Sequence, residues 1–163
     1  MSMRTAVVLL AAVASAPLAQ AQTKISGTVQ CAKPAQEFSI PVEGEAGHAY
    51  AISKGTCTWI KPMEIAGTKT KDDVLTNYDE IKGDTAQGHG DGVGTLVSGD
   101  QFRVRLDSKT ILKDGAPLSS DGKWKFVGGT GALKTVKGGG SYTCKAGPEG
   151  MTCEVSGDYS VTK

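Results

Sequence analysis

The chain has 163 residues, with 18 Lys and Arg against 17 Asp and Glu and a net charge of +1. This balance lacks the excess of basic residues by which proteins bind nucleic acids and anionic membrane surfaces, so we expect no nucleic-acid partner. The 22 glycines are dispersed among alternating apolar residues, which is typical of a folded chain rather than of a low-complexity or disordered one.

Residues 1–21 have the three parts of a secretory signal peptide. Arg4 supplies the positive charge, residues 6–14 are apolar, and Ala19-Gln20-Ala21 forms a cleavage site of the small-x-small type. The apolar run is shorter than the about 20 residues that a membrane-spanning helix needs. We therefore predict an exported protein, periplasmic or extracellular, with residues 22–163 as one domain and no membrane span after signal cleavage.

Apolar and polar residues alternate with a period of two along most of residues 22–163, which is typical of strands with one dry and one wet face. Gly-containing turns such as Asp114-Gly115 and Asp121-Gly122 separate the segments at short intervals that suit hairpins. Strands are expected near residues 24–31, 37–42, 48–60, 84–97, 101–106, 110–113, 123–127, 136–145 and 151–161. These eight to nine strands predict an all-β fold, a single antiparallel barrel of about eight strands.

One segment departs from this alternation. After Asp72 and Asp73, which are suitable helix caps, apolar residues recur at helical spacing: Val74, Leu75, Tyr78 and Ile81. A short helix is one expectation for this segment. A loop or an irregular strand is the alternative, because it would use the same residues over so short a stretch.

Four cysteines in an exported chain predict two disulfides. Cys144 and Cys153 flank residues 146–151, and if Ala146 pairs with Met151 the two cysteines face each other across a hairpin. That pairing leaves Cys31 to bond with Cys57. A redox pair or thiolate metal site would need a Cys-x-x-Cys spacing, which the chain lacks.

The motifs that could indicate a chemical function are weak. Gly129-Thr130-Gly131 would need a third glycine at the position of Lys134 to form a nucleotide-binding loop, so we expect residues 128–131 to supply positive φ angles and a close backbone approach instead. His48 and His89 lie far apart, and a flexible glycine loop is the preferred interpretation of residues 87–92, although His89 and Asp91 there could hold a cation. We predict no metal, no cofactor and no identifiable catalytic residue.

Six aromatic residues fall on the apolar side of their predicted strands and are the candidate ligand-binding residues: Trp59, Phe102, Trp124, Phe126, Tyr142 and Tyr159. They would either line a cavity or fill the interior, and filling is the commoner arrangement in an eight-stranded barrel.

Part of the chain resembles a known family. The pattern Trp124-x-Phe126-x-Gly128-Gly129-Thr130-Gly131, followed by Gly138-x-Gly140-x-Tyr142 and Gly157-x-Tyr159, is similar to the C-terminal half of the allene oxide cyclase barrel-like proteins, relatives of the dirigent proteins. The resemblance covers roughly residues 94–159 and implies an eight-stranded antiparallel barrel. Many bacterial members are exported proteins without a known activity. The plant cyclase steers an epoxide to a cyclopentenone in an apolar cavity, but no motif here corresponds to its active-site residues.

The leading hypothesis is a non-catalytic exported barrel that binds an apolar or amphipathic small molecule in its interior. Two alternatives remain open. One is an isomerase or cyclase that uses the same cavity to restrict the conformation of its substrate. The other is a structural or protein-interaction module, including a self-associating homo-oligomer, with a filled barrel.

Overall fold

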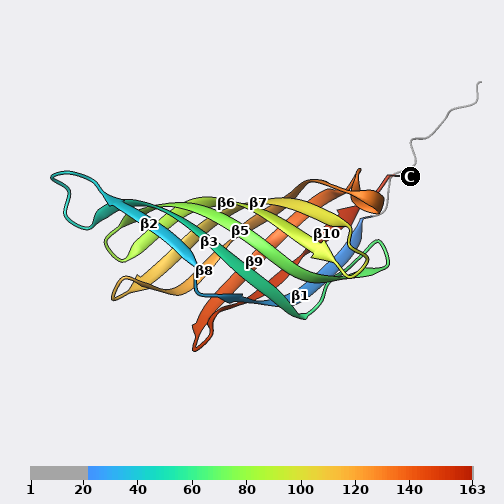
Figure 1. The fold of residues 1–163 in the computed structure, drawn as a ribbon, viewed down its shortest axis with the longest axis horizontal. Helices are drawn as coiled ribbons and strands as arrows, with labels where there is room; N and C mark the ends of the chain where they lie inside the picture. The colour runs from blue at the N-terminus through green and yellow to red at the C-terminus, as the bar shows by residue number, and fades with distance from the viewer. Residues whose placement is uncertain (1–21, 163) are drawn as a thin grey trace, which may run out of the picture.

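A computed structural model describes residues 22–162 as a closed antiparallel barrel of eight strands (Figure 1). The sheet closes because β3 pairs with β1 on one edge and with β5 on the other. This confirms the predicted all-β barrel. The predicted signal peptide lies outside the described residues. The barrel strands are β1 (Thr23–Ala32), β3 (His48–Lys61), β5 (Thr68–Lys82), β6 (Thr85–Leu96), β7 (Gln101–Lys113), β8 (Ala116–Gly129), β9 (Lys137–Gly147) and β10 (Gly150–Ser160).

Three short elements complete the fold. β2 (Gln36–Pro41) pairs with β3 alone and extends the sheet at one end of the barrel (Figure 1). β4 (Glu64–Ile65) pairs with the start of β5, and a 3₁₀ turn, η1 (Gly131–Leu133), follows β8. Among residues 22–162, no helix is long and apolar enough to cross a membrane.

The segment with helical spacing is a strand, so the helix is wrong and the strand alternative is confirmed. In β5, Leu75 and Ile81 point into the barrel and Val74 and Tyr78 point outward, as their pairing with β3 and β6 requires. The alternation was hidden because three inward positions between and beside these residues are polar: Asp73, Asn77 and Asp79. Because polar residues occupy inward positions of β5, its sequence lacks the apolar alternation by which strands are recognised.

Residues 87–92 form the middle of β6, so the flexible-loop interpretation is also wrong. Every inward position of this stretch is glycine, and the next inward position of β6 is also a glycine, Gly94. We call Gly88, Gly90, Gly92 and Gly94 the glycine lane of β6. A Cβ at Gly92 would lie 2.6 Å from Leu75 Cδ2 and 2.9 Å from Val104 Cγ2. The glycines leave room for inward side chains of β5 and β7, which lets the sheet curve tightly at β6.

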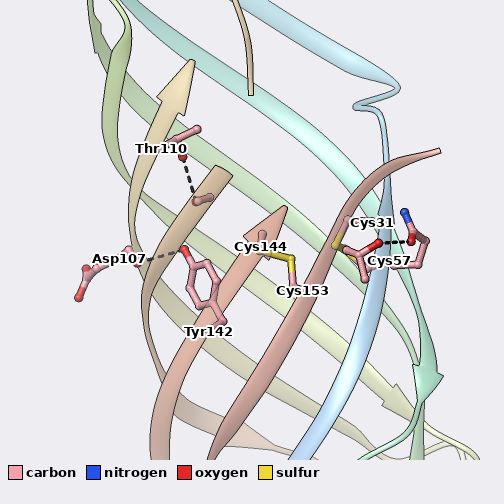
Figure 2. The surroundings of a disulfide bond; sticks show 10 residues. Cys31, Cys57, Asp107, Thr110, Tyr142, Cys144 and Cys153 are labelled. Carbon is pink, nitrogen blue, oxygen red and sulfur yellow. Dashed lines mark hydrogen bonds between the residues drawn. A yellow bond between two sulfur atoms is a disulfide. The ribbon is translucent and has the colours of Figure 1, made fainter. Parts of the chain in front are cut away.

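Both predicted disulfides are confirmed. Cys31 and Cys57 join β1 to β3, and Cys144 and Cys153 join β9 to β10, each pair in direct cross-strand register (Figure 2). Ala146 pairs with Met151 as expected. All four cysteines of the chain are used, which indicates an oxidising environment.

Only one half of the barrel is packed. Its core lies where β1, β5, β7 and β9 begin, and its buried aromatic residues are Trp59, Phe102, Trp124 and Phe126. Phe126 packs edge-to-face against both Phe102 and Trp124, with ring centroids 5.6 and 5.0 Å away. Leu133 of η1 closes this end and is fully buried.

The glycine-rich connection after β8 has the expected backbone. Gly128 and Gly131 have φ angles of 146° and 50°. A Cβ at Gly129 would lie 2.6 Å from the carbonyl oxygen of Leu133 and 2.7 Å from that of Gln101. The glycines therefore allow the chain to turn back over the packed end.

Candidate functional site

The other half of the barrel is hollow. A cavity of about 880 Å³ opens there, within the range typical of small-molecule sites. It is lined by six stretches of chain, each centred on one inward-pointing residue: Ala51, Asp79, Gly88, Ser108, Gly122 and Tyr142. We call these six residues the cavity ring.

The cavity ring is a single row across six neighbouring strands. Ala51 of β3 pairs with Asp79 of β5, and the row continues through β6, β7 and β8 to Tyr142 of β9, each residue in direct register with the next. Four of the six residues are Gly, Ala or Ser. Because these side chains are too small to reach the barrel axis, the space between the strands stays open.

Asp79 is the charged member of the cavity ring. It is half-buried, and its Oδ1 accepts a long hydrogen bond of 3.4 Å from the hydroxyl of Ser108. Burial raises the pKa of the Asp79 carboxyl, and the nearby Glu37 carboxylate of β2 adds to this shift, whereas the Ser108 hydrogen bond and the nearby His89 oppose it. Within residues 22–162, Asp79 forms no ion pair.

Tyr142 is the aromatic member of the cavity ring. Its hydroxyl donates to the backbone oxygen of Asp107 at 3.2 Å, which fixes the position of the ring (Figure 2). Burial raises the pKa of Tyr142 to about 12, so the phenol is neutral at physiological pH, and Asp79 is among the carboxylates that reinforce the shift. The two side chains thus lie within electrostatic reach of each other.

The neighbouring inward row at the mouth combines the apolar Ile81 and Ala86 with two hydroxyl residues. Thr110 of β7 donates to the hydroxyl of Ser120 of β8 at 3.0 Å, and the two residues are paired in register (Figure 2). In the opposite direction, toward the packed half, the next row contains Asn77 of β5 and the apolar Leu106 and Trp124 of β7 and β8. Along β7 and β8, the cavity therefore has hydroxyl groups at its mouth and apolar side chains on its floor.

The two histidines point outward from the barrel, and His89 borders the cavity from its outward position. His48 contacts Glu45 at 2.6 Å and Glu80 at 2.9 Å, and His89 contacts Asp107 at 2.9 Å. Hydrogen bonds from Lys82, His48 and Tyr50 lower the pKa of Glu80 to about 2. Asp91 pairs with Tyr78 and Arg105 rather than with His89. In the described part of the chain, no group of three or more His, Cys, Asp or Glu is arranged to hold a metal ion.

The structure separates the six aromatic residues predicted to bind a ligand, all of which point inward as expected. Only Tyr142 lines the cavity. Trp59, Phe102, Trp124 and Phe126 are buried in the packed half, and the Tyr159 hydroxyl accepts a 2.9 Å hydrogen bond from the amide of Ala66. Packing accounts for the burial of these five, and their contact with a ligand stays a prediction.

Sequence reasoning did not single out the other five members of the cavity ring. Nothing distinguishes Ala51, Ser108 or Gly122 locally from other small inward residues. Their common level in the barrel depends on the register of six strands, which is set by pairings between distant segments. The signal that was available is Asp79, a charged residue at an inward position of β5.

A second carboxyl lies inside the packed half. Asp73 Oδ2 accepts a 3.0 Å hydrogen bond from Trp59 Nε1, while Oδ1 is buried without a hydrogen-bond partner. Burial raises the pKa of Asp73 to about 7. Asp73 lies on the far side of the Leu75 and Asn77 rows from the cavity ring, so we assign it to the core.

Comparison of the chain with protein-family models, with curated proteins and with solved structures gives no match. The functional argument therefore depends on the geometry of the barrel.

Proposed function

We propose that this protein is an exported barrel that binds an amphipathic small molecule in the hollow half of its lumen. The observation that carries the proposal is the cavity of about 880 Å³ bounded by the cavity ring. An opening of this size inside a small barrel leaves apolar surface exposed to water unless a guest covers it. Along β7 and β8, the hydroxyl groups at the mouth and the apolar side chains of the floor match a guest with one polar and one apolar end.

Export through a signal peptide in residues 1–21 is part of this proposal, and the two disulfides support it. Membership of the allene oxide cyclase barrel-like proteins is likewise a hypothesis, supported by the eight-stranded antiparallel architecture. The isomerase alternative uses the same cavity and stays a prediction, since Asp79 and Tyr142 are the titratable groups that such chemistry could use.

Native mass spectrometry of the protein purified from its own host tests the proposal. We expect a reproducible additional mass of a few hundred daltons that denaturation removes. The variant Ala51→Leu places a larger side chain in the cavity and should lose this mass. Thr56→Leu, at an exposed outward position of the same strand, should retain it. Ligand-free protein in repeated preparations would contradict the proposal.

Self-association is the second candidate function, and the free edge of β2 favours it. In the described chain, β2 pairs with β3 alone, so its outer backbone groups are available for another strand. Two of its outward side chains are apolar and exposed, Phe38 at 67% and Ile40 at 72%. A second copy that pairs with β2 edge to edge would satisfy the backbone groups and cover these side chains.

Sedimentation equilibrium over a range of concentrations tests this second candidate. We expect a dimer for the native sequence and a monomer for Phe38→Lys. Val97→Lys is the matched control, because Val97 is also 67% exposed but lies in the turn after β6. A native protein that stays monomeric, or a Phe38→Lys variant that still dimerises, would refute self-association through β2.

A further inference from the structure

The charged side chains at inward positions of the barrel strands are acidic. The inward positions of the eight barrel strands carry two carboxyls, Asp73 and Asp79, and in the part of the chain that the structure describes they carry no Lys, Arg or His. Glu37 of β2 adds a third carboxylate, at a position paired with the inward Ser53. The basic residues of the strands alternate to the outer face, as Arg103 and Arg105 do in β7, and His89, Lys109 and Lys123 border the cavity from such outward positions.

This asymmetry is not a consequence of composition. Outside the predicted signal peptide, Arg4 excluded, the chain carries 17 basic and 17 acidic residues. Asp79 is the charged residue whose side chain points into the cavity, so its carboxylate lowers the energy of a cation there and raises that of an anion.

Asp79 is the group in the cavity best suited to contact such a cation. In the described part of the chain, one side chain donates a hydrogen bond to Asp79, the Ser108 hydroxyl at 3.4 Å. The carboxylate can accept several more hydrogen bonds, so most of its acceptor capacity is unused. A half-buried carboxylate without an ion-pair partner is unfavourable, and the pKa of Asp79 stays raised although the nearby His89 opposes the shift. A bound ammonium group would supply the missing charge and two or three hydrogen-bond donors.

Tyr142 supplies a second feature that favours a cation. Its hydroxyl is held by the backbone oxygen of Asp107, so the ring is fixed at the wall of the cavity. The face of an aromatic ring attracts cations, most strongly where water is partly excluded. The next row toward the core, with Leu106 and Trp124, provides the apolar surface for a hydrocarbon part.

We infer that the guest of this barrel is an amphipathic amine, with its ammonium group on Asp79 beside Tyr142 and its hydrocarbon part directed toward the apolar floor. This inference rests on the proposed function, because it specifies the chemistry of the molecule in the same cavity. It excludes fatty acids and other anionic amphiphiles as preferred guests.

Three probes with the same hydrocarbon chain test the inference by isothermal titration calorimetry at pH 7.5. These are octylammonium, octanol and octanoate, each below the concentration at which it aggregates. We expect octylammonium to bind at least about tenfold more tightly than octanol, the effect of one charged hydrogen bond, and octanoate to bind most weakly. Equal binding of the three probes would overturn the inference, as would the absence of binding by octylammonium.

Two variants separate a local contact from a general charge effect. Asp79→Asn should lower the affinity for octylammonium about tenfold and leave octanol binding unchanged. Asp84→Asn removes the same charge from the exposed turn between β5 and β6 at the same end of the barrel, and should bind octylammonium like the native protein. Equal losses in both variants would overturn the inference, because they would indicate attraction by net charge alone.

The two proposals fail in different ways. If an additional mass co-purifies from the host and Ala51→Leu removes it, but the three probes bind equally, the cavity is a binding site and the amine inference is wrong. If no mass co-purifies and none of the probes binds, both proposals are wrong.

Discussion

Trp59 donates a hydrogen bond from its indole Nε1 to Oδ2 of Asp73 at 3.0 Å, inside the packed half of the barrel. The second oxygen of the same carboxyl, Oδ1, is buried and receives no hydrogen bond. A Cβ at Gly94 would lie only 2.5 Å from this oxygen, so the glycine lane of β6 helps to make room for the carboxyl. The hydrogen-bonding capacity of Asp73 is therefore satisfied at Oδ2 and unsatisfied at Oδ1.

This arrangement predicts how stability depends on pH. Burial raises the pKa of Asp73 to about 7 in the folded protein, against about 3.9 when unfolded. Between these values the folded state holds a proton that the unfolded state has released. The free energy of unfolding should therefore fall as the pH rises from about 4 to 7, by about 1–3 kcal/mol, because Asp73 keeps some solvent contact.

The variant Asp73→Asn isolates this contribution. Urea unfolding at a series of pH values should show a smaller fall for Asp73→Asn than for the native protein, because the amide does not titrate. Asp84→Asn, in the exposed turn between β5 and β6, should keep the native slope. Parallel curves for native protein and Asp73→Asn would show that Asp73 does not hold a proton in this range.

The pH dependence of ligand binding should go in the opposite direction. Burial raises the pKa of Asp79, so this carboxyl becomes neutral on acidification before an exposed aspartate would. The ammonium of octylamine stays charged throughout. Calorimetric affinity for octylammonium should therefore weaken as the pH falls from 7.5 to 4, whereas Asp79→Asn should bind with the same low affinity at both values. A pH-independent affinity of the native protein would argue against contact with Asp79.

The glycine lane of β6 should not tolerate a methyl group at Gly94. A Cβ there would overlap the ring of Phe102, which is 2% exposed and cannot move aside. We expect Gly94→Ala to lower the free energy of unfolding by about 2–3 kcal/mol. Gly55→Ala is the control, since this inward glycine of β3 has nothing nearer its Cβ than the carbonyl oxygen of Ala32 at 4.0 Å, and the change should be neutral or slightly stabilising.

Thermal unfolding of the two glycine variants checks this expectation. Similar losses of stability in both would mean that glycine is needed for backbone conformation throughout the barrel. The argument from crowding at Gly94 would then fail.

The two disulfides should differ in their effect on stability. Cys31 and Cys57 are 26 residues apart and Cys144 and Cys153 are 9 apart. Loop-closure entropy gives about 3.6 kcal/mol for the longer loop and about 2.7 for the shorter. Replacing both cysteines of a pair by alanine should therefore destabilise more at Cys31 and Cys57 in urea unfolding. The reverse order would show that entropy of the unfolded chain does not control their contribution.

Much of the fold could be predicted from the sequence, because the evidence was local. Alternation identified β1, β3 and β10, and the residues between Cys144 and Cys153 identified a hairpin and its disulfide. β7 was divided into two predicted strands because Ser108 and Thr110 interrupt its apolar alternation. The same cause hid β5, where Asn77 and Asp79 point inward.

The residues that broke the pattern are the ones that form the candidate site. Asp79 and Ser108 are polar at inward positions, so strand prediction treats them as exceptions, and both belong to the cavity ring. The six aromatic residues were easier to recognise, but five of them lie elsewhere. Which inward residues surround an open space depends on side-chain volumes summed across strands that are distant in sequence, and local patterns do not report this sum.

The most direct test of the account is a ¹H–¹⁵N correlation spectrum of the native protein titrated with octylammonium. The account predicts that chemical-shift changes concentrate at Gly88, Ser108, Gly122 and Tyr142, with little change at Leu96, Phe102 and Leu133 in the packed half. Changes spread over outward residues such as Phe38 and Val93, or a spectrum without changes, would contradict it.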